Sequence, residues 1–308
     1  MTPNEAPQPR GVDPSDPHYK LYQQVRDAIL AVPGYFRSQT AIAGVMATDI
    51  HTLGAVLGAT IEQEVVRTLN EMREVWDPHR KYSLFRFARQ AQVFPDVLLR
   101  RAPSGRPEED ILLGIELKGW YLLAKEGEPS FRYAVTEAVC APRDLIAVVP
   151  WALSQVISGP PVIFTPYVVE AKYAAAYRNY YWQKLRQAKS NTAIAKPPKA
   201  APYPAKADEV ADRPASDSGG NFGRLARTGI MDEYMAQIRQ ELLGGIEVQH
   251  WMAFFSSFRE ARQEDRVRDA IEALSERIRG GQPPRAAPQD SLLKILEELG
   301  RLAAGEGQ

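Results

Sequence analysis

Two apolar stretches joined by a short Pro- and Gly-rich connection constrain the fold of this chain more than any other feature. Residues 93–101 and 111–123 have the apolar character of strands, and they flank Ala102-Pro103-Ser104-Gly105-Arg106-Pro107. This pattern predicts a β-hairpin. Side chains alternate along a strand, so Glu116 and Lys118 are expected on one face. Pairing of the two strands then brings Asp96 beside Glu116, and two carboxylates and one ammonium group converge.

Asp96 and Glu116 offer the oxygen ligands that Mg²⁺, or Mn²⁺ as a substitute, accepts in proteins. Such a cation keeps several waters and commonly takes one or two protein carboxylates together with substrate phosphate oxygens. It stabilises charge on a phosphodiester and lowers the pKa of a water, which Lys118 can orient. The sequence therefore predicts a metal-dependent nuclease site, with two strands ending in solvated charges as the plainer alternative.

The residues Pro95-Asp96 and Glu116-Leu117-Lys118 resemble the active-site motif of the PD-(D/E)xK nuclease superfamily. Many type II restriction endonucleases have this fold. The resemblance implies a metal held by Asp96 and Glu116, with the Leu117 carbonyl as a further ligand, and it implies that Lys118 is the catalytic lysine.

A second acidic-x-Lys triplet, Glu170-Ala171-Lys172, competes with the first one. We prefer Glu116-Leu117-Lys118 because its spacing from Asp96 suits a hairpin and because an apolar run precedes it. The resemblance covers residues 40–185, and no motif matches the last third of the chain.

Residues 53–76 have the apolar periodicity of a helix, with one stripe formed by Leu57, Ile61, Val65, Leu69 and Met72. Glu62 stands at the edge of this stripe and is expected to face the domain, whereas Glu64 is expected to face water. The resemblance implies that an acidic residue of a preceding helix joins the metal site, and Glu62 fits that role better than Glu64. A salt-bridged surface glutamate is the equal alternative.

The expected fold class is α/β, with a central mixed β-sheet flanked by helices in a restriction-endonuclease-like core and a helical C-terminal region. Short apolar runs at 145–149 and 162–164 are predicted to be further buried strands. The expected segments are a disordered N-terminus (1–17), a nuclease core (18–187), a flexible linker or insertion rich in Pro, Ala and Lys (188–220) and a helical region (221–308) with helices at 231–243, 248–258, 260–279 and 291–302.

Composition narrows the class of protein. The 308 residues carry a formal net charge of zero, the single cysteine excludes an intramolecular disulfide, and no stretch has the roughly 20 apolar residues of a membrane span. The N-terminus lacks the apolar core of a signal peptide, so a soluble cytoplasmic protein is expected.

Residues 183–206 are basic without any acidic residue, which suits either DNA contact or a solvated linker. Before them, Tyr173, Tyr177 and Tyr181 are expected to form the buried stripe of a helix.

The functional hypothesis is a type II restriction enzyme that cuts double-stranded DNA with Mg²⁺ and that works with a cognate DNA methyltransferase. A homodimer is expected because one candidate site per chain must serve two strands. The apolar residues of 234–258 are expected either to form the dimer interface or to pack back on the nuclease core. The alternatives are a repair or recombination nuclease and a catalytically silent DNA-binding or interaction protein. Arg224 and Arg227 are expected to pair with Asp232 or Glu233.

Overall fold

The computed structural model of the chain describes residues 5–46, 49–90, 92–101, 111–186, 192–217 and 219–257. The predicted Pro/Gly-rich connection after residue 101 and the helices predicted at 260–279 and 291–302 lie outside the described residues. Among the described residues, no helix has the length and apolar character needed to cross a bilayer.

A mixed six-stranded β-sheet forms the centre of the molecule. Its path runs β1-β2-β3-β4-β5, with β6 also pairing with β4; β3 and β4 are parallel, and the other pairs are antiparallel. All nine residues of β4 are buried, as expected for an apolar strand between β3 and the pair formed by β5 and β6. The strands are β1 (Phe85–Arg89), β2 (Val97–Arg101), β3 (Ile111–Tyr121), β4 (Leu145–Leu153), β5 (Pro161–Ile163) and β6 (Tyr167–Glu170).

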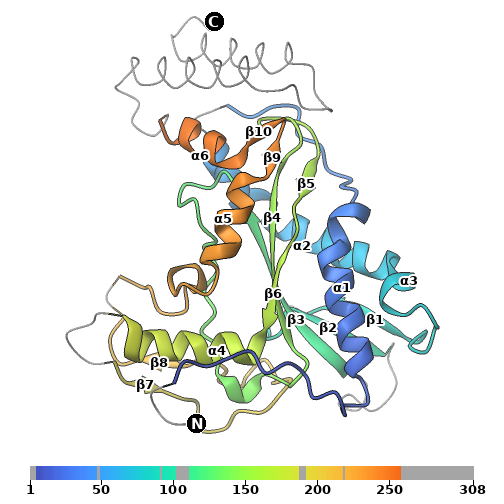
Figure 1. Ribbon diagram of the computed structural model, residues 1–308, viewed down its shortest axis with the longest axis vertical. Helices are drawn as coiled ribbons and strands as arrows, with labels where there is room; N and C mark the ends of the chain where they lie inside the picture. Colours follow the sequence, from blue (N-terminus) through green and yellow to red (C-terminus); the bar gives the residue numbers. More distant parts are fainter. Residues whose placement is uncertain are drawn as a thin grey trace, which may run out of the picture.

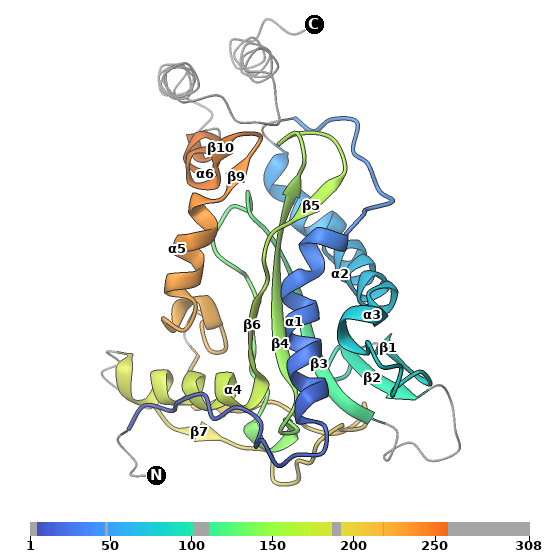
Figure 2. The same ribbon diagram turned by 45° about the vertical axis from the view of Figure 1, so that its right-hand side comes forward.

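Helices flank this sheet on two sides, which confirms the predicted α/β class. The helices α1, α2 and α3 lie on one side, and α5 and α6 lie on the other (Figures 1 and 2). The helix predicted at 53–76 is present as α2, which ends before Met72, followed by the short α3. The helices are α1 (Tyr19–Tyr35), α2 (Leu53–Glu71), α3 (Arg73–Trp76), α4 (Ala171–Tyr180), α5 (Asp232–Gln240) and α6 (Val248–Ser257), with short helical turns at Ile50–Thr52, Glu137–Val139, Tyr181–Leu185 and Leu225–Arg227.

The described N-terminal residues, which were expected to be disordered, contact the core at Gly11, Val12 and Asp16. The Val12 side chain is only 5% exposed, the Gly11 amide donates to Glu170 Oε1 (3.2 Å), and Asp16 Oδ2 lies 2.7 Å from Arg143 Nη1. In both views the segment runs along α4 (Figures 1 and 2). The sequence pattern missed this packing because its partners come from distant parts of the chain.

The apolar C-terminal segment also packs on the core, which was one of the two predicted possibilities. Trp251, Phe254 and Phe255 are buried, and His51 contacts the carbonyls of Leu123 (Nδ1, 2.8 Å) and Phe255 (Nε2, 3.3 Å). The helix predicted at 231–243 ends earlier, at Gln240. There a hairpin of β9 (Leu242–Leu243) and β10 (Ile246–Glu247) turns through two glycines with positive φ, Gly244 and Gly245.

The region predicted as a flexible linker is partly structured against the core. Its strands β7 (Ile194–Ala195) and β8 (Arg213–Pro214) pair with each other, and Ala211 forms a bridge with Val135. The Asp212 side chain is fully buried. The described part of this stretch therefore belongs to the folded unit, although most of its other side chains are exposed.

Candidate functional site

The predicted hairpin of β2 and β3 is present and brings Asp96 next to Glu116. Val97 pairs with Ile115, so Asp96, immediately before β2, stands opposite Glu116. The Asp96 amide donates to Glu116 Oε2 (3.3 Å), and the Leu117 amide donates to Asp96 Oδ2 (3.1 Å). Each carboxylate is thus held by the backbone of the other strand.

A close approach between the two strands fixes the Pro95-Asp96 segment. A Cβ atom added to Gly114 would lie 2.2 Å from Pro95 Cγ, so only glycine allows the proline ring to rest on β3. The Gln90 side chain donates to the Pro95 carbonyl (2.9 Å), and the Gln90 amide donates to the Asp96 carbonyl (2.7 Å). The Gly114 amide donates to Asp144 Oδ1 (2.7 Å), a buried carboxylate that the sequence analysis did not single out.

Glu62 reaches the same place from α2, as predicted. Its Oε1 accepts from the Gly119 amide (3.1 Å) and lies 3.4 Å from Lys118 Nζ, while its Oε2 lies 3.6 Å from Arg89 Nη2. Gly58 stands one turn before Glu62, and its carbonyl oxygen would lie only 3.6 Å from a Cβ atom at Gly119. The backbone of α2 thus passes next to β3 at Gly119, and Glu62 lies within hydrogen-bond distance of the strand.

The prediction that Glu64 faces water is wrong. The Glu64 side chain is buried, with the residue 7% exposed, and its Oε1 accepts from the Gln39 amide (2.9 Å). Residues before α2 cover this side of the helix, a contact that helical periodicity cannot reveal.

Burial and repulsion by neighbouring carboxylates raise the pKa of both strand carboxyls. Desolvation is the largest cause of the raised pKa of Asp96, which is about 6. The hydrogen bond from the Leu117 amide lowers this pKa, and the negative charge of Glu62 raises it. Desolvation also dominates for Glu116, whose pKa rises to about 8, followed by repulsion from Asp96. The two carboxyls therefore titrate as a pair that retains a proton near neutral pH unless positive charge is added.

The donor atoms fit a divalent cation held by two carboxylates. Leu117 points its amide toward Asp96, and the carbonyl of a strand residue points to the same edge as its amide, so the Leu117 carbonyl faces the same side. Oxygen donors of this kind suit Mg²⁺, which takes few protein ligands and keeps waters. No group of three or more His, Cys, Asp or Glu side chains within the described ranges has a metal-binding arrangement, and Glu62 is engaged by Lys118 and Gly119 instead.

The competing triplet lies at a different place. Glu170 ends β6 and accepts a hydrogen bond from the Gly11 amide, and Lys172 is exposed on α4.

Arg224 and Arg227 do not pair with Asp232 or Glu233 as expected. Both contact Glu128, and Arg224 also contacts Glu126.

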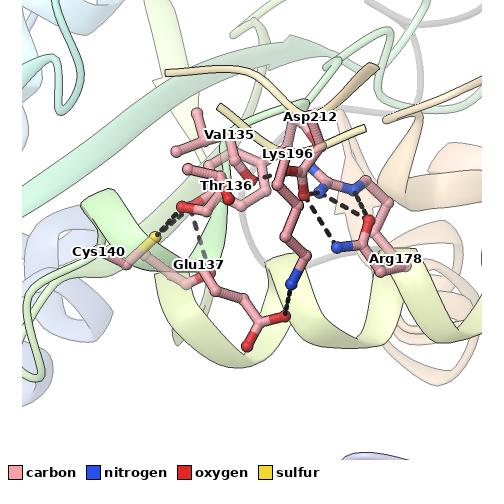
Figure 3. Close-up of polar contacts among 10 residues, drawn as sticks. Val135, Thr136, Glu137, Cys140, Arg178, Lys196 and Asp212 are labelled. Atoms are coloured by element: carbon pink, nitrogen blue, oxygen red, sulfur yellow. Dashed lines mark hydrogen bonds and ion pairs between the residues drawn. The ribbon is translucent and has the colours of Figure 1, made fainter. Parts of the chain in front are cut away.

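A second buried charged cluster, formed by Arg178 and Asp212, was not predicted. Figure 3 shows Arg178 directed at Asp212, with Nη2 2.6 Å from Oδ2. Arg178 Nη1 also donates to the carbonyls of Tyr133 (2.7 Å) and Val135 (2.9 Å). The Tyr133 ring lies 6.1 Å from the Phe94 ring, two residues before Asp96. Arg178 thus binds the backbone of the segment whose Tyr133 ring contacts Phe94.

Arg178 also explains why the predicted tyrosine stripe is wrong. The buried face of α4 carries Ala174, Ala175 and Arg178, whereas Tyr173 and Tyr177 are half-buried. Small side chains are needed there because the arginine fills the space between α4 and the Tyr133 segment.

Comparison with known proteins found no matching family model, no similar curated protein and no similar solved structure. The arguments about function therefore come from the geometry of Asp96, Glu116, Lys118 and Glu62.

Proposed function

We propose that this protein is a Mg²⁺-dependent nuclease of the PD-(D/E)xK type that hydrolyses phosphodiester bonds of double-stranded DNA. The observation that carries the proposal is the pairing of Asp96 with Glu116, two half-buried carboxyls with raised pKa values, next to Lys118, which lies on the same strand as Glu116. A protein gains no stability from burying two adjacent acidic groups, so their arrangement favours a bound cation.

The residues of the chain have separate roles in this proposal. Asp96, Glu116 and the Leu117 carbonyl would hold the cation, which when bound supplies positive charge to the phosphodiester and acidifies water. Lys118 keeps 39% of its side chain exposed while Glu62 holds its ammonium group at 3.4 Å. This position lets Lys118 orient the attacking water or contact the phosphate, and Glu62 is a positioning residue for Lys118.

A restriction role is the more specific part of the proposal. It includes a homodimer that cuts both strands and a partner methyltransferase that protects host DNA. It follows from the resemblance of the motif and from analogy at the level of the fold, rather than from a contact in the structure.

Cleavage of supercoiled plasmid in Mg²⁺ tests the proposal. We expect Asp96→Ala, Glu116→Ala and Lys118→Ala to abolish cutting while duplex binding persists, and we expect the control Lys172→Ala to cut at the wild-type rate. Discrete fragments would indicate a restriction enzyme, and cuts that depend on DNA structure would indicate a repair nuclease. Cutting at the wild-type rate by all three variants would overturn the site assignment, and a wild-type protein that binds without cutting would be a silent scaffold.

A further inference from the structure

Two arginines stand directly opposite each other on the two-stranded ribbon formed by β1 and β2. Arg86 pairs with Arg100 in the antiparallel register, and both side chains are exposed. Among the described residues, neither side chain takes part in an ion pair or a side-chain hydrogen bond. Within the described residues, the ribbon therefore presents two positive charges at one point without an acidic partner.

The two arginine side chains repel each other within the described part of the ribbon. Side chains directly opposite each other on antiparallel strands have Cβ atoms about 5 Å apart, and like charges at this distance repel. The surrounding sequence provides no compensation on β1, because it contains no acidic residue between Asp77 and Asp96. The acidic residues of the connection after residue 101 lie outside the described residues. An anion from outside the chain would relieve the repulsion.

The arginine pair shares a face of the sheet with the candidate site. Side chains alternate along β2, so Arg100 and Asp96, four residues apart, point to the same side, with the buried Leu98 between them and a shift in the β2–β3 register between Leu99 and Arg100. Asp96 in turn stands opposite Glu116, and Lys118 follows Glu116 on the same face of β3. At a rise of about 3.3 Å per residue, the arginine pair lies roughly 13 Å along the strand from Asp96.

We propose that Arg86 and Arg100 grip the phosphodiester backbone of the DNA duplex that is cut at Asp96 and Glu116. This inference rests on the proposed nuclease function and adds the surface that holds the substrate. The guanidinium fork matches phosphate oxygens, and a separation of roughly 13 Å corresponds to about four base-pair steps at 3.4 Å each. A continuous polyanion can therefore contact the arginine pair and the site at once.

The test measures binding of a fluorescent duplex oligonucleotide by anisotropy over a range of salt concentrations, in Ca²⁺ to suppress cutting. Each phosphate contact contributes about 0.9 to the slope of log K against log salt. The double variant Arg86→Ala/Arg100→Ala should therefore lose about 1.8 from the slope and bind about tenfold or more weakly. A control with the same loss of charge, Lys172→Ala/Arg213→Ala, should keep the wild-type slope.

One further variant and a melting measurement separate the effect of charge from an effect on folding. Arg86→Lys/Arg100→Lys keeps both charges and should retain most of the slope, whereas Arg86→Ala/Arg100→Ala should melt no lower than the wild type because it removes a repulsion. An unchanged slope in the double alanine variant overturns the inference, as does a wild-type protein that binds no duplex. An equal loss of binding to polyglutamate would assign the surface to an acidic protein and would also overturn it.

Failure of the proposed function gives a different pattern. If the wild type binds duplex through the arginine pair but cuts no DNA in Mg²⁺, the nuclease proposal fails and the backbone-binding surface stands. If it cuts DNA while the double alanine variant binds and cuts normally, only the inference about Arg86 and Arg100 fails.

Discussion

Glu116→Gln should make the metal-free protein more stable. The Glu116 carboxyl has a pKa of about 8 in the folded protein against an ordinary value of 4.5, because it is desolvated and repelled by Asp96. One pKa unit corresponds to about 1.4 kcal/mol, so keeping this carboxyl buried at pH 7 costs about 3 kcal/mol. A neutral amide avoids most of that cost and still accepts from the Asp96 amide, so we expect a gain of about 2 kcal/mol.

The pH dependence of this gain has a definite sign. A carboxyl whose pKa is raised by folding lowers stability progressively as the pH rises from 4.5 toward 8. The difference between Glu116→Gln and the wild type should therefore be small below pH 4.5 and largest near pH 8. Bound Mg²⁺ should stabilise the wild type, by about 2.7 kcal/mol at a concentration 100 times the dissociation constant, and should leave the variant nearly unchanged.

Urea unfolding in EDTA and in saturating Mg²⁺, at several pH values, measures both effects. Glu71→Gln is the matched control, because Glu71 is an exposed glutamate near the end of α2 with 58% of its side chain accessible. It should change neither the stability nor the response to Mg²⁺. A Glu116→Gln protein that is less stable than the wild type at pH 8, or that gains as much from Mg²⁺, would refute the reasoning.

Four other substitutions have distinct expected outcomes. Glu62→Gln should slow cutting with little loss of stability, whereas Glu64→Ala should cost about 1–3 kcal/mol by removing a buried acceptor, as measured by urea unfolding. Asp212→Ala should cost about 3–5 kcal/mol because it leaves the Arg178 charge buried without its partner; a smaller loss than Glu64→Ala would contradict this. Gly114→Ala should abolish cutting and lower the stability by about 1–3 kcal/mol, because the added methyl group would overlap the Pro95 ring. Wild-type cutting by this variant would disprove the close approach of Pro95 to Gly114.

Local patterns were enough to predict the hairpin, α2 and the convergence of Asp96, Glu116 and Lys118. Alternation along β3 and helical periodicity along α2 are properties of neighbouring residues, and each identified the correct face for Glu116 and Glu62. The short apolar run at 145–149 was correctly predicted to be buried for the same reason, although β4 extends to Leu153.

The remaining features depend on contacts between distant residues. Glu64 is buried by the backbone of Gln39, and Arg178 is neutralised by Asp212, 34 residues later in a stretch with the composition of a linker. A pattern in one segment contains no information about such partners. Gly54 on α2, eight residues before Glu62, was a usable signal, because a Cβ atom there would lie 3.3 Å from Tyr121 Cβ and a glycine on a helix face can indicate a close neighbour.

The central claim is that Asp96 and Glu116 together hold a divalent cation, and a crystal soaked in Mn²⁺ tests it most directly. Mn²⁺ substitutes for Mg²⁺ and gives an anomalous signal that identifies its position. We predict one anomalous peak between the two carboxylates, about 2.0–2.3 Å from an oxygen of each and close to the Leu117 carbonyl. The peak should disappear in Glu116→Gln crystals soaked in the same way. A peak elsewhere in the molecule, or none at these carboxylates, would contradict the account.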